Sequence, residues 1–361
     1  MSADSRRSFL ENISATALAA VYPSSFVRYT ESLPNPSAAI IKPSSLRPGA
    51  LVGLVSPASG VYEREEIRMA QEIAESLGLR VEIGRHAGDA YGFLAGQDQD
   101  RADDLSRMFQ RRDVHAVWAV RGGYGSSRLL PLLDYAVIRD NPKPLIGYSD
   151  ITALHLAIHR LSGLVTFHGP IARQLFSEYT LKAFKKALFQ GEPIGPTGLP
   201  PPFSPREGAT EWENRVVVIG GGKCEGRTTG GNLSLVTATL GTPFEIDTRG
   251  RILFLEDVGE EPYRVDRMLT QLWLSGKLSE AAGVVFGKFS NCGPAEYKPG
   301  YSNTLSLEEV LRIRMEPLKI PCLYGLLFGH VRDNATLPLG VRAALDADAK
   351  NFTILESAVV L

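Results

Sequence analysis

Cysteine and histidine are scarce in this chain of 361 residues. The three cysteines, Cys224, Cys292 and Cys322, are far apart and form no CxxC or CxxH pair, so neither a structural zinc site nor a disulfide framework is expected. His155 and His159 have the spacing of two metal ligands on one helix face, but no HExxH motif is formed. We interpret both as ordinary helix residues and expect neither a metal ion nor a cofactor.

The sequence also lacks an excess of charge and a long apolar run. The formal net charge is -1 at pH 7 and no basic stripe is present, so a nucleic-acid partner is not expected. No run of 18 apolar residues occurs, which argues against an ordinary transmembrane helix. The composition, 44% hydrophobic and 22% charged, is typical of globular domains, and the length predicts two of them.

Residues 1–45 read as a signal-like segment followed by a linker. The sequence SRRSFL at residues 5–10 precedes a mildly apolar stretch at 13–22, a pattern that resembles a twin-arginine export signal. Proline and serine are frequent from residue 23 to 45, as in linkers. The alternative is a cytoplasmic tail that happens to contain two adjacent arginines.

The first half of the chain alternates strand-like and helix-like segments. Apolar runs predict strands at 50–55, 79–83, 116–120, 144–147 and 165–167, and helical periodicity appears at 64–77, 102–109, 127–133 and 150–161. Strands that alternate with helices indicate βαβ units and a parallel sheet. We therefore predict an N-terminal α/β domain over residues 46–190.

A stretch rich in proline and glycine follows, and we interpret residues 191–210 as an interdomain linker. Beyond it, strands are predicted at 215–219, 252–255 and 283–287, with a helix at about 263–274. Residues 211–361 are thus expected to form a second, smaller α/β domain.

The strongest local signal is the sequence IGYSDIT at residues 146–152, in which a strand ends and a helix begins almost without a loop. Such a turn exposes Ser149 at the carboxyl edge of the sheet, where open α/β sheets bind ligands. The helix N-terminus offers free N–H groups to a developing oxyanion. A serine that merely caps the helix is the alternative. The GxSxG motif is absent, since Asp150 and Ile151 occupy the last two positions.

A second signal is the sequence RGGYG at residues 121–125, which ends the preceding strand. Its glycines allow the backbone to approach a ligand closely, and an N–H of Gly122 or Gly123 could supply the other half of an oxyanion hole. A phosphate-binding loop is the rival interpretation, but neither glycine-rich phosphate motif fits. Ser126 and Ser127 follow this loop, although a helix that starts after a loose loop makes a poorer nucleophile turn.

A serine nucleophile requires a base, and the base requires an orienting acid. His330 follows a glycine at an apparent strand end, a position from which it can project into a cleft. His168, also at a strand end, is expected to form part of the wall of the site. The apolar strand at 252–255 ends in Glu256, which could orient an imidazole, but on the residues alone Asp257 or Glu260 would serve equally well.

Taken together, eight segments resemble the LD-carboxypeptidase family, which includes murein tetrapeptide carboxypeptidases and microcin self-immunity peptidases. They occur in family order: VGLVSP at 52–57, RGGYG at 121–125, GYSD at 147–150, GGNL at 230–233, FLED at 254–257, RVDR at 264–267, GH at 329–330 and TLPLG at 336–340.

The resemblance implies a catalytic triad with Ser149 as nucleophile, Glu256 as acid and His330 as base. The oxyanion donors fall on the backbone N–H groups of Asp150 and of the turn at Gly122 and Gly123. The resemblance further implies a flavodoxin-like N-terminal sheet, a smaller C-terminal α/β domain, an active site in the cleft between them, no metal, and a homodimer.

The implied substrate is a murein stem peptide, cleaved at the L,D-peptide bond between diaminopimelate or lysine and a terminal D-alanine. A carboxypeptidase also has to bind the terminal carboxylate, for which Arg121 is a candidate, with Tyr124 as a neighbouring substrate-binding residue. Arg121 has the alternative role of locking the glycine-rich loop.

Three other functions compete with this one. A microcin-type peptidase would use the same triad on peptidyl-nucleotide conjugates, and Trp212 could stack on a base. A non-catalytic muropeptide-binding module on the same fold would require a misplaced triad residue. An amidotransferase-like enzyme would need a cysteine at position 149, which is serine.

The N-terminal segment predicts export to the periplasm, whereas the short members of the family are cytoplasmic. We expect the wild-type chain in the periplasmic fraction, shortened at its N-terminus by intact-mass measurement. Replacing Arg6 and Arg7 together by lysine should retain the full-length chain in the cytoplasm. Wild-type chain recovered only at full length from the cytoplasm would refute this prediction.

Overall fold

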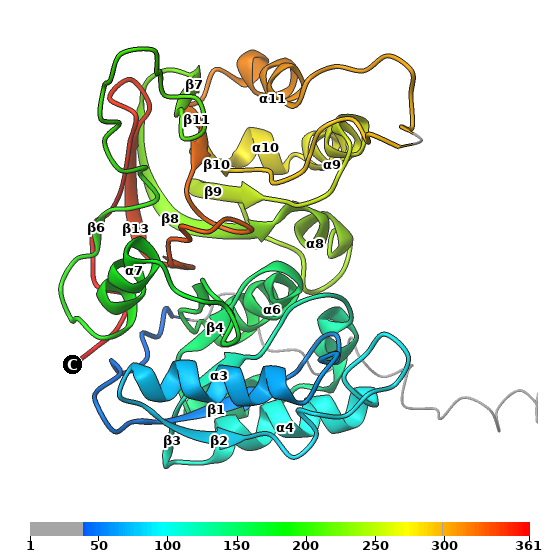
Figure 1. Cartoon of the computed structure of the whole chain (residues 1–361), viewed down its shortest axis with the longest axis vertical. Helices are drawn as coiled ribbons and strands as arrows, with labels where there is room; N and C mark the ends of the chain where they lie inside the picture. The colour runs from blue at the N-terminus through cyan, green and yellow to red at the C-terminus, as the bar shows by residue number, and fades with distance from the viewer. Residues whose placement is uncertain (1–38, 298) are drawn as a thin grey trace, which may run out of the picture. The chain divides into compact units, whose positions relative to one another are not determined.

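The computed structural model describes residues 39–297 and 299–361. The predicted export signal at residues 5–22 lies outside the described residues. The described residues form one compact unit that contains two β-sheets, one below the other in Figure 1. No helix among the described residues is long and apolar enough to span a lipid bilayer.

The first sheet has six strands in the order β12-β5-β4-β3-β1-β2. The five strands from the first half of the chain are parallel and follow the order 2-1-3-4-5, which is the flavodoxin-like arrangement. This confirms the predicted fold class. The strands are β1 (Leu51–Val55), β2 (Arg80–Ile83), β3 (Val114–Ala119), β4 (Leu145–Gly147), β5 (Phe167–His168) and β12 (Leu337–Pro338).

The helices of this lobe are α3 (Glu65–Ser76), α4 (Asp98–Gln110), α5 (Tyr135–Asp140), α6 (Thr152–Ser162) and α7 (Glu178–Leu188), with 3₁₀ turns η2 (Ser126–Leu132) and η3 (Ser149–Ile151). Helix α6 is buried along its whole length except at Arg160. A helix that is apolar on all sides belongs in a protein interior, and α6 contacts both β5 of the first sheet and β8 of the second.

The second sheet has eight strands in the order β6-β14-β13-β8-β9-β10-β11-β7. Its strands are β6 (Gly195–Pro196), β7 (Val217–Gly220), β8 (Lys223–Asn232), β9 (Arg251–Glu256), β10 (Gly283–Gly287), β11 (Cys322–Leu326), β13 (Arg342–Asp346) and β14 (Asn351–Ile354). Its helices are α8 (Leu233–Ala238), α9 (Pro262–Leu274), α10 (Lys277–Glu280) and α11 (Leu307–Met315), with the 3₁₀ turn η4 (Glu316–Leu318).

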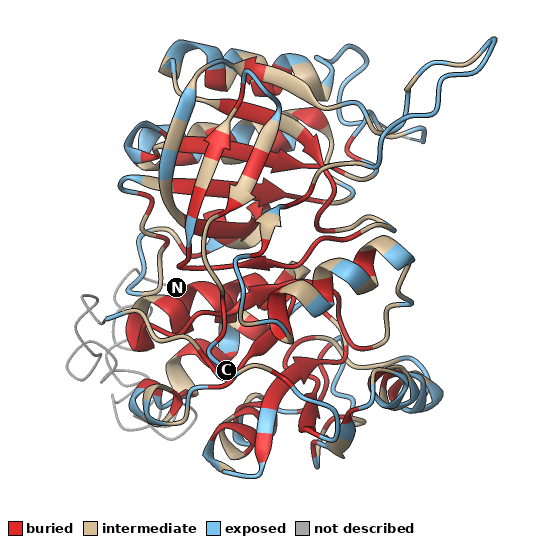
Figure 2. Ribbon diagram, turned by 90° about the vertical axis from the view of Figure 1, so that its left-hand side faces the viewer, coloured by how far each residue is buried: buried red, intermediate tan, exposed pale blue. Residues whose placement is uncertain are grey.

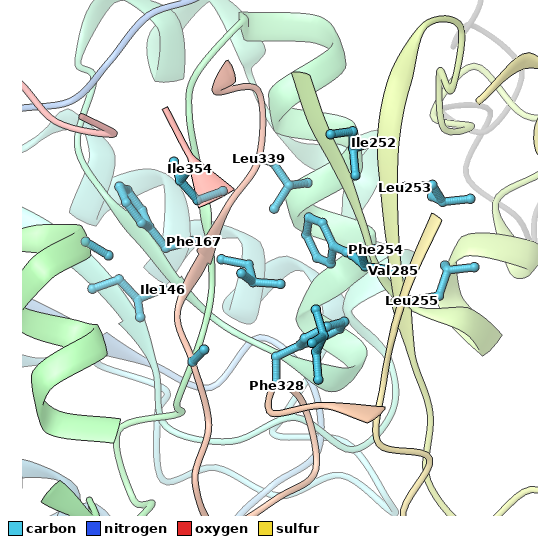
Figure 3. Close-up of a cluster of buried hydrophobic side chains, with 14 of the residues drawn as sticks. Ile146, Phe167, Ile252, Leu253, Phe254, Leu255, Val285, Phe328, Leu339 and Ile354 are labelled. Carbon is cyan, nitrogen blue, oxygen red and sulfur yellow. The ribbon is translucent and has the colours of Figure 1, made fainter. Parts of the chain in front are cut away.

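Two short strands do not follow the division of the chain that the sequence pattern predicts. Strand β6 lies within the predicted linker yet pairs with β14 of the second sheet. Strand β12, from the last third of the chain, pairs antiparallel with β5 of the first sheet. One buried apolar cluster runs through both lobes. Figure 3 shows Ile146 and Phe167 of the first sheet facing the same region as Phe254 of the second, and Figure 2 shows the interior of both sheets as buried.

Three histidines are buried in this interior. Burial lowers the pKa of His155 to about 4. Burial, helped by the charge of Arg251, lowers the pKa of His159 to about 4. Burial also lowers the pKa of His168 well below its ordinary value. All three are therefore neutral at pH 7, whereas in the unfolded chain they take up protons near pH 6.5.

Stability should consequently fall on mild acidification. Because the folded-state pKa values are lowered, the unfolded chain binds more protons below pH 6.5, and the stabilisation is complete only above that pH. Each histidine can lower the free energy of unfolding by up to roughly 1.4 kcal/mol for each pH unit below 6.5. Urea unfolding at pH 8, 7, 6 and 5 should give a plateau between pH 8 and 7 and a decline below.

The matched control is His86→Asn, because His86 is partly exposed and its pKa is raised by its hydrogen bond with Asp89. In this variant the free energy of unfolding should still decrease below pH 7, as in the wild-type protein. Equal stability at pH 5 and pH 7 in the wild-type protein would contradict the assignment.

Candidate active site

Ser149 occupies a strained turn between β4 and α6. Its φ is 64°, in the left-handed region that non-glycine residues rarely adopt. The turn leaves little room, since a Cβ on Gly147 would lie 3.0 Å from Ile151 and 3.2 Å from Ala119. The Ser149 side chain caps no helix. Its hydroxyl Oγ lies 3.0 Å from Nε2 of His330, so the capping interpretation does not hold.

His330 lies in the loop after β11, and its second ring nitrogen, Nδ1, is 2.7 Å from Oε2 of Glu256. The backbone N–H of His330 donates to the same oxygen at 3.2 Å, and its carbonyl accepts a hydrogen bond from the Ser290 hydroxyl. The imidazole is thus held from both the ring and the backbone. The preceding residue, Gly329, has φ 89°, and a Cβ there would overlap the Glu256 carboxylate.

Glu256 ends β9 and is completely buried. Its other oxygen, Oε1, is 3.5 Å from the side-chain amide of Asn232 and 3.7 Å from Nε2 of His168. His168 therefore lies beside the Glu256 carboxylate, as expected of a residue in the wall of the site. Of the three acids that the sequence left open, Glu256 is the one hydrogen-bonded to His330.

The other two acids point elsewhere. Asp257 accepts hydrogen bonds from the Ser234 amide at 2.9 Å and the Ser234 hydroxyl at 2.8 Å, so it ties the end of β9 to the start of α8. Glu260 lies 3.8 Å from Arg264. Burial raises the pKa of both carboxyl groups, and in Glu260 the Asp257 charge adds to that effect.

Tyr148 packs its ring against His330, with the ring centroids 4.8 Å apart. Burial and the nearby Glu256 carboxylate raise the pKa of Tyr148 to about 12, so its hydroxyl stays neutral. His168 is neutral as well. The buried charge next to His330 is therefore that of Glu256, and a negative charge at that position stabilises the imidazolium that forms when His330 takes a proton.

The glycine-rich loop lies directly against the nucleophile. A Cβ on Gly122 would fall 3.0 Å from Cβ and 3.3 Å from Oγ of Ser149, so a larger residue there would press against the serine. Gly123 has φ 111° and packs on Ser59 of the loop after β1. The buried Arg101 holds these two loops together by donating to the carbonyls of Pro57, at 2.5 Å, and Gly125, at 3.1 Å.

Asp150 has a supporting role in addition to its backbone N–H. Its buried carboxylate accepts the backbone N–H of Ser126 at 2.7 Å, and the Ser126 hydroxyl donates to the Asp150 carbonyl. Burial raises the pKa of Asp150 despite these hydrogen bonds. The pair fastens the glycine-rich loop to the Ser149 turn. Ser126 is therefore buried and engaged, and it does not face His330 as a rival nucleophile.

Arg121 and Tyr124, the two candidate substrate-binding residues, occupy the same loop. Arg121 donates from Nη1 to the carbonyl of Gly60 at 2.8 Å, and its guanidinium carbon lies 5.0 Å from the centre of the Tyr62 ring. Tyr124 is 54% exposed, with its ring edge-to-face with Phe93. Arg121 thus does lock the loop, while Tyr124 is free to meet a ligand.

The helix histidines have structural roles. His155 bonds through Nε2 to the carbonyl of Gly147 at 2.8 Å, which supports the nucleophile turn from beneath. His159 bonds to the carbonyl of Leu164 at 3.0 Å. Elsewhere, His86, Asp89 and Asp100 bring three possible metal-ligand atoms within 4.8 Å of one another. That group shares no residue with the Ser149 site.

The line from Ser149 through His330 to Glu256, with a glycine loop beside the serine, has the geometry of serine hydrolases that transfer acyl groups. Family models agree with this class. The LD-carboxypeptidase N-terminal domain matches residues 52–169, and the LD-carboxypeptidase C-terminal domain matches residues 225–345. The chain belongs to the LD-carboxypeptidase family, whose members are serine-type peptidases.

Several curated proteins are similar over most of their length. The probable murein peptide carboxypeptidase of Bacillus subtilis is 41% identical over 88% of this chain and 95% of its own. The murein tetrapeptide carboxypeptidase of Pseudomonas aeruginosa is 32% identical, covering 82% and 93%. The microcin C7 self-immunity protein of Escherichia coli is 31% identical, covering 79% and 86%.

Solved structures give the same picture. A microcin C7 self-immunity protein in complex with aspartyl sulfamoyl adenosine aligns with a TM-score of 0.77 at 28% identity, covering 89% of this chain and all of that one. A muramoyltetrapeptide carboxypeptidase from Oxalobacter formigenes aligns with a TM-score of 0.70 at 30% identity, covering 86% of this chain and all of that one.

Gly329 offers a direct test of the triad geometry. Gly329→Ala should displace the Glu256 carboxylate from His330 and lower the turnover of a murein tetrapeptide by roughly 10²-fold, because catalytic groups misplaced by about 1 Å lose that much. Gly250→Ala is the control, since Gly250 also has a positive φ, 62°, but has open space around its Cβ position. Equal activity in the two variants would show that the collision with Glu256 is irrelevant.

Proposed function

We propose that this protein is a serine-type LD-carboxypeptidase that releases terminal D-alanine from murein tetrapeptides. The observation that carries the proposal is the continuous hydrogen-bonded line from Ser149 to His330, at 3.0 Å, and from His330 to Glu256, at 2.7 Å. Ser149 comes from the first lobe, whereas His330 and Glu256 come from the second.

In the first half of the reaction, Ser149 Oγ attacks the carbonyl carbon of the L,D-peptide bond while His330 Nε2 takes its proton. Glu256 holds the other ring nitrogen, which keeps Nε2 free to accept and stabilises the imidazolium. Gly122 packs on Ser149 and Asp150 follows it in the chain, so the backbone N–H groups of Gly122 or Gly123 and of Asp150 are the proposed donors to the oxyanion.

In the second half, His330 returns the proton to the leaving amine of D-alanine, and the shortened peptide remains as an ester on Ser149. A water molecule that loses its proton to His330 then hydrolyses the ester and restores the serine. No step requires a metal ion. The substrate assignment follows the murein peptide carboxypeptidases to which the chain is similar.

A second candidate is cleavage of a peptidyl-nucleotide conjugate by the same three residues. The similarity to microcin C7 self-immunity proteins favours it, including the structure with aspartyl sulfamoyl adenosine. In this chain, Trp212 is 86% exposed and lines a hollow with two cations, Arg215 and Lys288, and two acids, Glu213 and Glu308. The indole could stack on a base, and comparing hydrolysis of the two substrate types would separate the candidates.

The family resemblance further supports a homodimer, and the N-terminal segment supports a periplasmic location. Murein peptides occur in the periplasm, so location and substrate agree with each other. Light scattering on the purified protein would measure the dimer directly.

Substitution of Ser149 tests the mechanism. Ser149→Ala should lower turnover of a murein tetrapeptide, followed by mass spectrometry, by at least about 10³-fold. His330→Ala should cost a similar factor, and the double variant little more, because nucleophile and base act as one unit. Glu256→Gln should cost less, since Glu256 orients the base without touching the substrate.

Ser127→Ala is the matched control. Ser127 is half-buried on η2, whereas the neighbouring Ser126 hydroxyl holds the Asp150 carbonyl and would disturb the Ser149 turn if removed. The control should retain most activity, as should wild-type enzyme in EDTA. Full activity of Ser149→Ala would end the serine mechanism, and loss in EDTA that zinc restores would indicate a metal enzyme instead.

A further inference from the structure

Two arginines lie side by side next to the Ser149 turn. Arg121 follows β3, and Arg173 follows β5 at the same carboxyl edge of the parallel sheet. The backbone N–H of Arg173 reaches the carbonyl of Val120, the residue before Arg121, at 3.4 Å. Arg121 in turn precedes Gly122, which packs directly on Ser149.

One acid serves both arginines. Glu66, in the first turn of α3, accepts the backbone N–H of Tyr62 at 2.8 Å and of Glu63 at 3.3 Å, which fixes its carboxylate in place. That carboxylate also pairs with Nη1 of Arg173. Burial alone would raise the pKa of Glu66, but the two backbone hydrogen bonds and the charges of Arg173 and Arg121 bring it below its ordinary value.

The cluster keeps one positive charge and spare donors. Two guanidinium groups against one carboxylate leave a surplus of one charge. Each guanidinium carries five N–H donors, yet the structure gives Arg121 one hydrogen bond, to Gly60, and Arg173 one, to Glu66. The Nε atoms of both arginines are buried without a partner in the described part of the chain. Buried donors without partners are costly, so an anion that accepted hydrogen bonds from both arginines would stabilise the cluster.

The cluster of Arg121, Arg173 and Glu66 is connected to the Ser149 turn through Gly122 and to His330 through Tyr148. Arg121 connects to Ser149 through Gly122. Arg173 lies close enough to Tyr148 that its charge partly offsets the rise in the pKa of that phenol caused by burial and by Glu256, and Tyr148 packs its ring on His330. The two arginines therefore lie on segments that adjoin Gly122 and Tyr148, the residues packed on Ser149 and His330. The terminal carboxylate of a carboxypeptidase substrate lies one residue beyond the scissile carbonyl, so the groups that bind it have to lie close to the reacting residues.

We propose that Arg173, together with Arg121, binds the free carboxylate of the terminal D-amino acid and thereby makes the enzyme a carboxypeptidase. This inference rests on the proposed function. Glu66 holds Arg173 in place. Guanidinium groups suit the role because their planar donors match a carboxylate in a bidentate manner.

The experiment compares two substrates that differ only at the terminal group. One tetrapeptide ends in L-lysyl-D-alanine with a free carboxylate, and the other ends in L-lysyl-D-alaninamide. The wild-type enzyme should have a higher kcat/KM for the peptide with the free carboxylate (the acid) than for the peptide with the terminal amide. Arg173→Met should lower kcat/KM for the acid by roughly 10- to 100-fold, the usual worth of a charge-assisted hydrogen bond, and change kcat/KM for the amide less than about twofold. Arg173→Lys should recover part of the preference.

Arg128→Met is the control, since Arg128 is also paired with an acid, Asp98, on the same lobe but outside this cluster. It should keep the wild-type preference. Equal losses on acid and amide in Arg173→Met would overturn the carboxylate assignment and leave the proposed function standing. Failure of the wild-type enzyme to cleave either peptide would overturn the proposed function and this inference with it.

Discussion

The buried carboxylate of Glu256 is the constraint on which the arrangement of the two lobes depends. A charge without exposure to water is costly unless hydrogen bonds surround it. Its partners come from the His330 ring and backbone and from the amide of Asn232. Those residues lie on different segments of the second lobe, and His330 then reaches across to Ser149. The hydrogen bonds that the buried Glu256 carboxylate requires therefore order the loop that carries His330.

On the first lobe, the Ser149 turn that faces His330 is held rigidly by its surroundings. Ser149 has a left-handed backbone conformation that costs energy, and its surroundings hold it there. His155 supports Gly147 from below, Asp150 fastens the adjacent loop through Ser126, and Arg101 binds that loop to the one after β1. Ser149 thus has little conformational freedom. Fixed positioning of this kind lets a group react with a bound substrate without reorganising the site.

Much of this could be predicted from the sequence, and the remainder could not for physical reasons. Apolar runs revealed β1, β3 and β4 because those strands are buried on both faces. Strand β8, with lysine, arginine, threonine and glycine, escaped detection because its neighbours rather than its composition make it a strand. Family resemblance chose Glu256 over Asp257. Arg121 was named from the sequence as a carboxylate-binding candidate, but Glu66 and Arg173 gave no sequence signal, because separate elements bring them to it.

Strand β12 has a consequence for how this molecule can be divided. It comes from the last third of the chain, yet it covers the outer edge of β5 in the first sheet. A fragment that ended after the first lobe would leave the β5 edge with open backbone N–H and C=O groups, which favour pairing with other chains and aggregation. If the two halves were expressed separately, they would have to associate before the first sheet could gain its β12 edge strand. We therefore expect the two lobes to fold as one unit, which brings Ser149 and His330 together in the same step.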